Sequence, residues 1–241
     1  MDLSFDDKAK ILSRTKALKG ELMKNPCVKE AFEKLDNLPA ELCYHNKQHT
    51  SEVLHDALMF AMIDGEVSKK EMELLGIAAA FHDTGFVVSS KENEPIGAKF
   101  AEKSMRKHRY SEEDISQVKL MILDTQLKPV TENGKFTLRQ FSNSALSGFL
   151  LDADVSNFGR RDFPIKTDLV YTETKAQDPV KFFSFVEGLL SSHSWQTEAA
   201  AAVRQVCKNK NIENVKERLS RLSNEMQIKQ GVSLPLAAPG M

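Results

Sequence analysis

The sequence predicts an all-α fold in a single domain. Apolar residues recur at helical spacing through most of the 241-residue chain, and no alternating strand pattern of any length is evident. Ser68 and Ser111, which can cap helices, stand before two of the apolar runs. Hydrophobic residues make up 41% and charged residues 28% of the chain, a balance that can bury a core. Because no internal repeat or long linker divides the chain, we expect one helical bundle.

In the first half of the chain, residues that start or stop helices separate the apolar runs. Asn25-Pro26 ends the first run, because the residue before a proline avoids the helical conformation. Gly65 ends the third run, and Ser68 with Glu71 forms a capping box that opens the fourth. The helices predicted from these signals span residues 7–24, 28–35, 50–64, 68–83, 96–108 and 112–123.

The second half of the chain is predicted to hold three further helices, over residues 143–158, 179–190 and 197–228. Residues 89–94 are expected to form a loop, and Asn133-Gly134 is the one strong turn signal. These expectations divide the chain into an N-terminal helical extension, a main domain and a flexible C-terminal tail, over residues 1–40, 41–228 and 229–241.

Composition restricts the expected partners and compartment. The net charge is about −1 and no basic block stands out, so neither nucleic acid nor an anionic membrane is implied as a partner. The longest apolar stretch is too short to span a membrane, and the acidic N-terminus lacks a secretory signal. Cys27, Cys43 and Cys207 form no CxxC pair, which favours a cytoplasmic protein without disulfides. Cys43 is either a thiol nucleophile or ligand near His45, or a buried inert thiol.

The dipeptide His82-Asp83 is the most informative feature of the chain. It ends the apolar run 74–81, and Gly85 can close that helix directly afterwards. Neighbouring residues on a helix point about 100° apart, so both reach one ion only where a helix bends or ends. Because imidazole nitrogen and carboxylate oxygen are good ligands for Zn, Mn, Fe and Mg, the dipeptide predicts part of a metal site.

Two other segments carry residues with the same chemistry. His45 and His49 are four residues apart and share one face if their segment is helical. Asp152 and Asp154 interrupt an otherwise apolar stretch. A carboxylate in a buried helix costs several kcal/mol unless it is paired or bound to a cation. We therefore expect at least one of these two acids to have a partner.

The order H…HD…D resembles that of the HD-domain superfamily of metal-dependent phosphohydrolases. The segment 44–50, Tyr-His-Asn-Lys-Gln-His-Thr, is similar to the branch that includes the cyclic-nucleotide phosphodiesterases and many bacterial HD hydrolases. The resemblance covers roughly residues 40 to 220 and implies a single HD-domain helical bundle. Other segments that look like those of the family are 78–86, 124–129, 151–154, 159–163 and 195–197.

This resemblance implies a divalent metal ion, of Mn, Mg, Zn or Fe, and four ligands to it. The residues alone leave the choice between Asp152 and Asp154 open, whereas the family pattern favours Asp154. Asp152 would then turn away as a support or a salt-bridge partner. The implied ligands are His49, His82, Asp83 and Asp154.

The resemblance also implies residues that act on the substrate. His45 corresponds to the histidine that protonates the leaving oxygen in the phosphodiesterases; the alternative is a supporting residue that holds Asn46 or the metal ligands. Glu94 is a second catalytic candidate, at a place where many relatives have a His-Glu pair and this chain has Asn93-Glu94. The candidates for binding phosphate, with solvated surface charge as the alternative, are Lys128, Arg160 and Arg161.

Two departures from the family pattern bear on the number of metal ions. Asn93 replaces a histidine, and Thr84-Gly85-Phe86 stands where the phosphodiesterases have another histidine shortly after the HD pair. Both departures favour one tightly held ion, although a second, weakly bound ion that uses water and Asp83 stays open.

The expected function is hydrolysis of a phosphate ester by metal-activated water, with a nucleotide or another small phosphorylated metabolite as substrate. The single-metal ligand set favours phosphomonoesters, whereas the segment 44–50 favours phosphodiesters, as in a cyclic-nucleotide-type phosphodiesterase. A catalytically silent HD domain that acts as a binding or interaction module is the alternative from another class. A diiron HD oxygenase would need more histidines between His82 and Asp154 than His108 alone.

Overall fold

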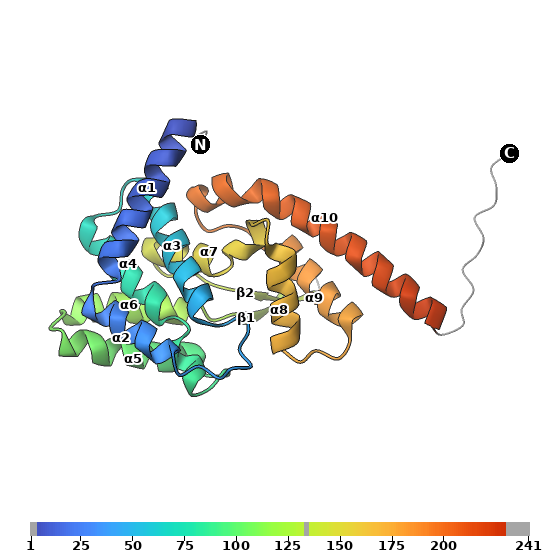
Figure 1. Ribbon diagram of the computed structural model, residues 1–241, viewed down its shortest axis with the longest axis horizontal. Coiled ribbons are helices and arrows are strands. Elements are labelled where there is room, and N and C mark those ends of the chain that lie inside the picture. Colours follow the sequence, from blue (N-terminus) through green and yellow to red (C-terminus); the bar gives the residue numbers. More distant parts are fainter. Residues whose placement is uncertain (1–3, 133–134, 230–241) are drawn as a thin grey trace.

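A computed structural model describes residues 4–132 and 135–229 and has the predicted all-α, single-domain fold (Figure 1). The helices and strands, in chain order, are α1 (Phe5–Leu22), α2 (Pro26–Leu35), α3 (Lys47–Asp64), α4 (Lys69–Phe81), the 3₁₀ helix η1 (Thr84–Val87), α5 (Asn93–Lys107), α6 (Glu112–Asp124), β1 (Lys128–Glu132), β2 (Lys135–Arg139), α7 (Ala145–Asp154), the 3₁₀ helix η2 (Ser156–Gly159), α8 (Phe163–Glu173), α9 (Pro179–Ser192) and α10 (Glu198–Lys229).

Helix α4 lies at the centre of the larger of two hydrophobic cores. It is apolar on every side from Leu74 to Phe81, and all of these residues are buried. A helix that is apolar all round is stable in water only when other elements cover it. Helices α2, α3, α5, α6 and α7 all contact α4 and cover it. The residues that follow Phe81 therefore emerge inside the protein and not at its surface.

A second, smaller core lies between η2, α8, α9 and α10. Phe158, Phe163, Phe183 and Leu190 are buried there with Val215 of α10. Figure 1 shows the C-terminal end of α10 projecting beyond the other helices. No helix in the described parts of the chain is long and apolar enough to cross a membrane.

Both serine caps that precede apolar runs are present. Ser68 and Glu71 form the capping box that opens α4, as predicted. Ser111 caps α6 in the same way with Asp114. In each box the serine hydroxyl accepts a backbone N–H that has no partner within the helix, and the acid does the same at the serine nitrogen.

The β1–β2 hairpin and helix α8 were not predicted. Strands β1 and β2 form an antiparallel hairpin in which Lys128 pairs with Arg139, and each strand has only five residues, too few for alternation to be distinctive. The predicted turn at Asn133-Gly134 lies outside the described residues. Helix α8 escaped prediction because its apolar side chains do not share one face, and Ile165 is 66% exposed.

Some predicted boundaries differ from the observed ones near the candidate site. The predicted helix 143–158 is divided, because α7 ends at Asp154 and η2 follows it. The predicted loop 89–94 ends early, since α5 begins at Asn93. Gly85 does not close α4 in a left-handed conformation but lies in η1. A Cβ atom on Gly85 would lie 2.0 Å from the carbonyl oxygen of Asn93, so the residue is small because α5 passes against it. The predicted tail lies outside the described residues apart from Lys229.

Buried polar contacts attach α10 to α3 and η2. The Arg204 guanidinium donates to Asp56 Oδ2 at 2.7 Å and to Ser156 Oγ at 2.8 Å. Ser156 Oγ donates to the same Asp56 oxygen at 2.5 Å. Gly159 makes a close backbone approach here: a Cβ atom on it would lie 2.5 Å from the carbonyl oxygen of Arg204. A buried ion pair therefore attaches α10 to α3. The backbone of η2 can approach α10 closely because Gly159 has no side chain.

We expect Gly159→Ala to destabilise the protein by about 1–3 kcal/mol, because the new methyl group overpacks the contact between η2 and α10. Gly20→Ala is the matched control, since nothing lies within 4 Å of a Cβ at this exposed position of α1. The control should stabilise the protein by about 0.5–1 kcal/mol through helix propensity. Urea denaturation of both variants measures the difference, and equal midpoints would show that the close approach is not required.

Candidate metal centre

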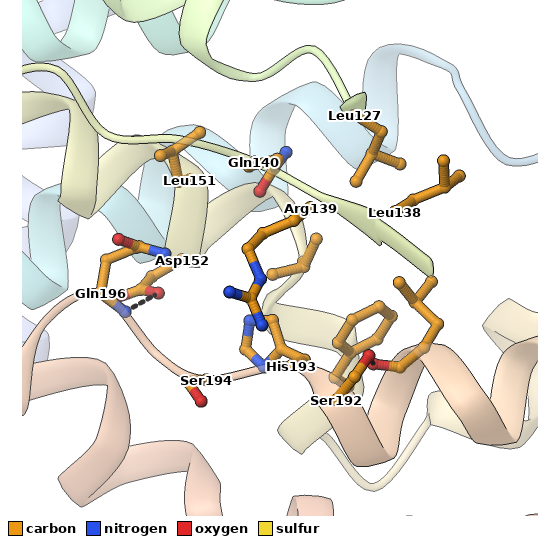
Figure 2. Close-up of a pocket in the computed structure, with 13 residues that line it drawn as sticks. Leu127, Leu138, Arg139, Gln140, Leu151, Asp152, Ser192, His193, Ser194 and Gln196 are labelled. Atoms are coloured by element: carbon orange, nitrogen blue, oxygen red, sulfur yellow. Dashed lines mark hydrogen bonds between the residues drawn. The ribbon is translucent and has the colours of Figure 1, made fainter. Parts of the chain in front are cut away.

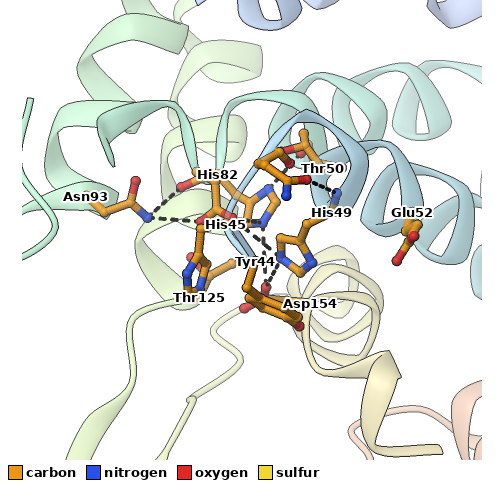
Figure 3. A network of polar contacts seen from close by, with 12 residues as sticks. Tyr44, His45, His49, Thr50, Glu52, His82, Asn93, Thr125 and Asp154 are labelled. Atoms are coloured by element: carbon orange, nitrogen blue, oxygen red, sulfur yellow. Dashed lines mark hydrogen bonds and ion pairs between the residues drawn. The ribbon is translucent and has the colours of Figure 1, made fainter. Parts of the chain in front are cut away.

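Four of the predicted site residues lie at helix ends that meet inside the protein (Figure 3). His49 is in the first turn of α3, where the side chain of Asn46 caps the helix by accepting from the His49 backbone nitrogen. His82 and Asp83 directly follow α4, and Asp154 ends α7. Because α3 packs against both α4 and α7, the three chain segments are brought together.

The side chains of these four residues face one another. His49 Nε2 lies 3.4 Å from Asp83 Oδ2 and 3.4 Å from Asp154 Oδ1. His82 Nε2 lies 3.2 Å from the same oxygen of Asp83 and 3.5 Å from the same oxygen of Asp154. Two imidazole nitrogens thus face two carboxylate oxygens around a common point.

Three of these atoms are buried and lack a hydrogen-bond partner among the described residues: His49 Nε2, His82 Nε2 and Asp83 Oδ2. Each buried polar atom without a partner costs about 1–3 kcal/mol. The ligand atoms of His49, His82 and Asp83 all lie within 4.8 Å of one another. This cluster can hold a metal ion, and a cation among the three atoms would satisfy all of them. Two nitrogens and an oxygen form a donor set that suits a divalent transition metal.

His82 and the two carboxylates of the cluster are each held by a second contact. His82 Nδ1 lies 2.8 Å from the carbonyl oxygen of Ala79, which can only accept, so Nδ1 carries a proton and Nε2 is the ring nitrogen that faces the cluster. Asn93 donates to Asp83 Oδ1 at 3.2 Å, and Gln140 donates to Asp154 Oδ2 at 2.9 Å.

Burial and neighbouring charges oppose each other at the two carboxylates. Burial alone would raise the pKa of Asp83, but His82 outweighs it and lowers this pKa. Burial likewise opposes ionisation of Asp154, yet His49 and His82 hold its pKa well below the usual value. Both carboxylates stay ionised in the interior, so negative charge is concentrated where a cation would bind.

Asp152 takes no part in the cluster, although it is only two residues from Asp154. Its carboxylate accepts from the backbone nitrogen of Gln196 at 2.8 Å (Figure 2). It also accepts from the backbone nitrogen and the hydroxyl of Thr197 at 2.9 and 2.7 Å. Burial raises the pKa of Asp152 to about 6 despite these hydrogen bonds. It therefore supports the start of α10, whereas Asp154 faces the two histidines.

His45 lies in the bend before α3 and not on a helical face shared with His49, because α3 begins only at Lys47. Its Nδ1 is hydrogen-bonded to Glu173 Oε1, and its ring stacks on Phe86 with 4.6 Å between ring centroids. Burial alone would lower the pKa of His45, but the contact with Glu173 and the charges of the nearby carboxylates raise it. The side chain is 29% exposed, so it lies between the cluster and solvent.

Sequence reasoning missed Glu173. Its other oxygen, Oε2, accepts from the backbone nitrogens of Tyr44 and His45 at 2.7 and 3.0 Å. The carboxylate therefore fixes both the backbone and the ring orientation of His45. Glu173 ends α8 and is 128 residues from His45 in the chain, so no local motif connects the two.

The other predicted residues are not part of the cluster. Glu94 is partly buried at the start of α5; burial, together with the charges of the cluster carboxylates, raises its pKa. The Arg160 guanidinium is bound to Glu52 Oε2 at 2.9 Å and to Asp162 Oδ2 at 2.7 Å. Lys128 and Arg161 are exposed, and within the described residues neither forms an ion pair with the cluster. Cys43 was considered either as a nucleophile or ligand near His45 or as an inert thiol. Its thiol donates to the carbonyl oxygen of Leu169 at 3.2 Å.

Comparison with known proteins does not assign a family to the chain. No protein-family model, no characterised protein and no solved structure matches it. What the cluster can do is therefore inferred from its own residues and contacts.

A divalent ion should stabilise the chelator-treated protein. Ligand at 100 times its Kd adds about 2.7 kcal/mol, which corresponds to roughly 5–10 °C in Tm for a domain of this size. We expect Mn²⁺ or Zn²⁺ to produce such a shift, and His82→Ala to abolish it because a buried ligand is lost. His108→Ala is the control, since His108 contacts Glu30 and not the cluster. An equal metal-induced shift in both variants, measured by thermal denaturation with elemental analysis, would contradict the assignment.

Proposed function

We propose that this protein is a metal-dependent phosphohydrolase of the HD-domain type, which cleaves a phosphate ester of a nucleotide or another small phosphorylated metabolite. The observation that carries the proposal is the meeting of His49, His82 and Asp83 around three buried atoms without hydrogen-bond partners. The H…HD…D order of the sequence supports it independently of the geometry.

Asp154 is proposed as the fourth ligand. Its Oδ1 lies 3.4 and 3.5 Å from the two histidine nitrogens that face the cluster. These four residues would hold a divalent cation, which would supply Lewis acidity that lowers the pKa of a water molecule and polarises a phosphoryl oxygen. Because both carboxylates are ionised, their charge balances that of a divalent cation, and the protein supplies the charge that makes binding favourable.

His45 is proposed as the general acid. A general acid must be fixed in place and must reach the oxygen that leaves. Glu173 holds Nδ1, and stacking on Phe86 fixes the ring plane, so Nε2 is the atom that remains to donate. The partial exposure of the ring lets a substrate reach it.

The three cations proposed to bind phosphate differ in how they are held. Arg160 already forms ion pairs with Glu52 and Asp162, so contact with a phosphate would require it to exchange one of them. Lys128 and Arg161 are exposed and can move toward a substrate at little cost. Glu94 is proposed as a further general acid or base, because burial and the charges of the cluster carboxylates raise its pKa.

His45→Ala should keep the metal and lose turnover, by about 10²–10⁴-fold for a nucleotide substrate whose leaving oxygen needs a proton. The loss should be smaller for p-nitrophenyl phosphate and bis-p-nitrophenyl phosphate, because p-nitrophenolate leaves as a stable anion. Comparing these two esters in the unaltered protein also separates a monoesterase from a cyclic-nucleotide-type phosphodiesterase. The measurements are initial rates with and without added Mn²⁺ and the bound metal by elemental analysis.

Three variants make the result specific. His49→Ala should lose both metal and turnover with every ester, and Phe185→Ala, an exposed position on α9, should change neither. Full activity in His45→Ala would remove His45 from the mechanism. Bound metal without turnover on any ester would instead favour a silent HD domain that serves as a binding module.

A further inference from the structure

In each carboxylate of the cluster, the oxygen that points away from the two histidines accepts a hydrogen bond from a neutral side-chain amide. We infer that Asn93 and Gln140 are positioning residues that make Asp83 and Asp154 each present a single oxygen to the bound cation. The inference rests on the metal site of the proposed function and adds two residues that determine how tightly the cation is bound.

Asn93 acts on Asp83. Its Nδ2 donates to Asp83 Oδ1 at 3.2 Å and to the carbonyl oxygen of His82 at 3.0 Å, and the side chain is buried. Both partners can only accept, so the amide nitrogen and not the amide oxygen must face them. The outer oxygen of Asp83 is thereby occupied, and Oδ2 is left facing His49 and His82.

The amide oxygen of Asn93 shows that this orientation has a cost. Asn93 Oδ1 is buried and has no hydrogen-bond partner among the described residues. A buried acceptor without a donor is unfavourable by about 1–3 kcal/mol. The side chain therefore adopts the orientation that serves Asp83 and the His82 carbonyl, and not the one that would satisfy its own oxygen.

Gln140 acts on Asp154 in the same way from another direction. Its Nε2 donates to Asp154 Oδ2 at 2.9 Å and to the carbonyl oxygen of Thr125 at 2.8 Å, and the residue is 8% exposed. Oδ1 of Asp154 is left facing the two histidines. Thr125 precedes the β1–β2 hairpin and Gln140 follows it, so this single amide closes the base of the hairpin and anchors the carboxylate.

Figure 2 shows Gln140 beside the hairpin, at the wall of a cavity of about 160 Å³. The short hairpin, the only sheet among the described residues, thus delivers one hydrogen bond to the cluster.

The chemistry of the two amides matches what a ligand carboxylate needs. An amide orients a carboxylate without removing its charge, whereas a lysine or arginine at the same place would neutralise the ligand and repel the cation. Asp152 provides the contrast on the same helix, because donors from Gln196 and Thr197 occupy both of its oxygens. Asp83 and Asp154 are held on one oxygen only, which leaves the other oxygen for a cation.

The test measures metal affinity and not turnover. Gln140→Met and Asn93→Leu keep the side-chain volume and remove the donor, and each should weaken binding of Mn²⁺ or Zn²⁺ by about 10–100-fold. Gln196→Ala is the matched control, because Gln196 contacts Asp152 through its backbone and its side chain is exposed. The Kd is determined by competition with a chromophoric chelator, alongside the Tm of each metal-free protein.

The outcomes distinguish positioning from a structural role. A purely structural role lowers the Tm of the metal-free variants and leaves Kd within about threefold of the unaltered protein, and that result overturns the inference. If Asn93→Leu fails to fold, Asn93→Ser and Gln140→Met decide the question. Metal binding by the unaltered protein with equal Kd in the variants would reject the inference alone; no metal binding by the unaltered protein would reject the proposed metal site and the inference with it.

Discussion

The burial of two ionised carboxylates against two imidazoles is the interaction on which the rest of the structure depends. Asp83 and Asp154 stay charged in the interior only because His49 and His82 face them. Removing a charge from water costs several kcal/mol, so the arrangement is stable only when opposite charge lies nearby. The ends of α3, α4 and α7 must therefore meet at one place, and the packing of α3 against α4 and α7 brings them there.

One face of α3 connects the cluster to the C-terminal half of the protein. His49, Glu52 and Asp56 are spaced so that they lie on the same side of the helix. His49 contributes to the cluster, Glu52 pairs with Arg160 and Lys166, and Asp56 pairs with Arg204. The same helix face that holds a candidate metal ligand thus holds η2, α8 and α10 in place. Since most of these pairs are partly buried, truncation of one partner leaves an uncompensated charge.

Much of the fold and of the site could be predicted from the sequence. Long helices such as α3, α4 and α10 were expected because their apolar residues recur over many turns, and the capping box at Ser68 fixed the start of α4. The hairpin and α8 were not expected, because a strand of five residues and a helix without one apolar face leave little periodic signal. The sequence placed His45 and His49 on one face only if their segment is helical, and α3 begins at Lys47, after His45.

The sequence by itself determined which residue types could bind a cation, because His49, His82, Asp83 and Asp154 carry donor atoms whatever the fold. Only the tertiary structure decided how those atoms are arranged and which residues hold them. Glu173 reaches His45 across 128 residues, and Gln140 reaches Asp154 from beyond a hairpin. Local patterns report the conformation of neighbouring residues, whereas these contacts depend on how distant helices pack, and packing is decided by the whole core at once.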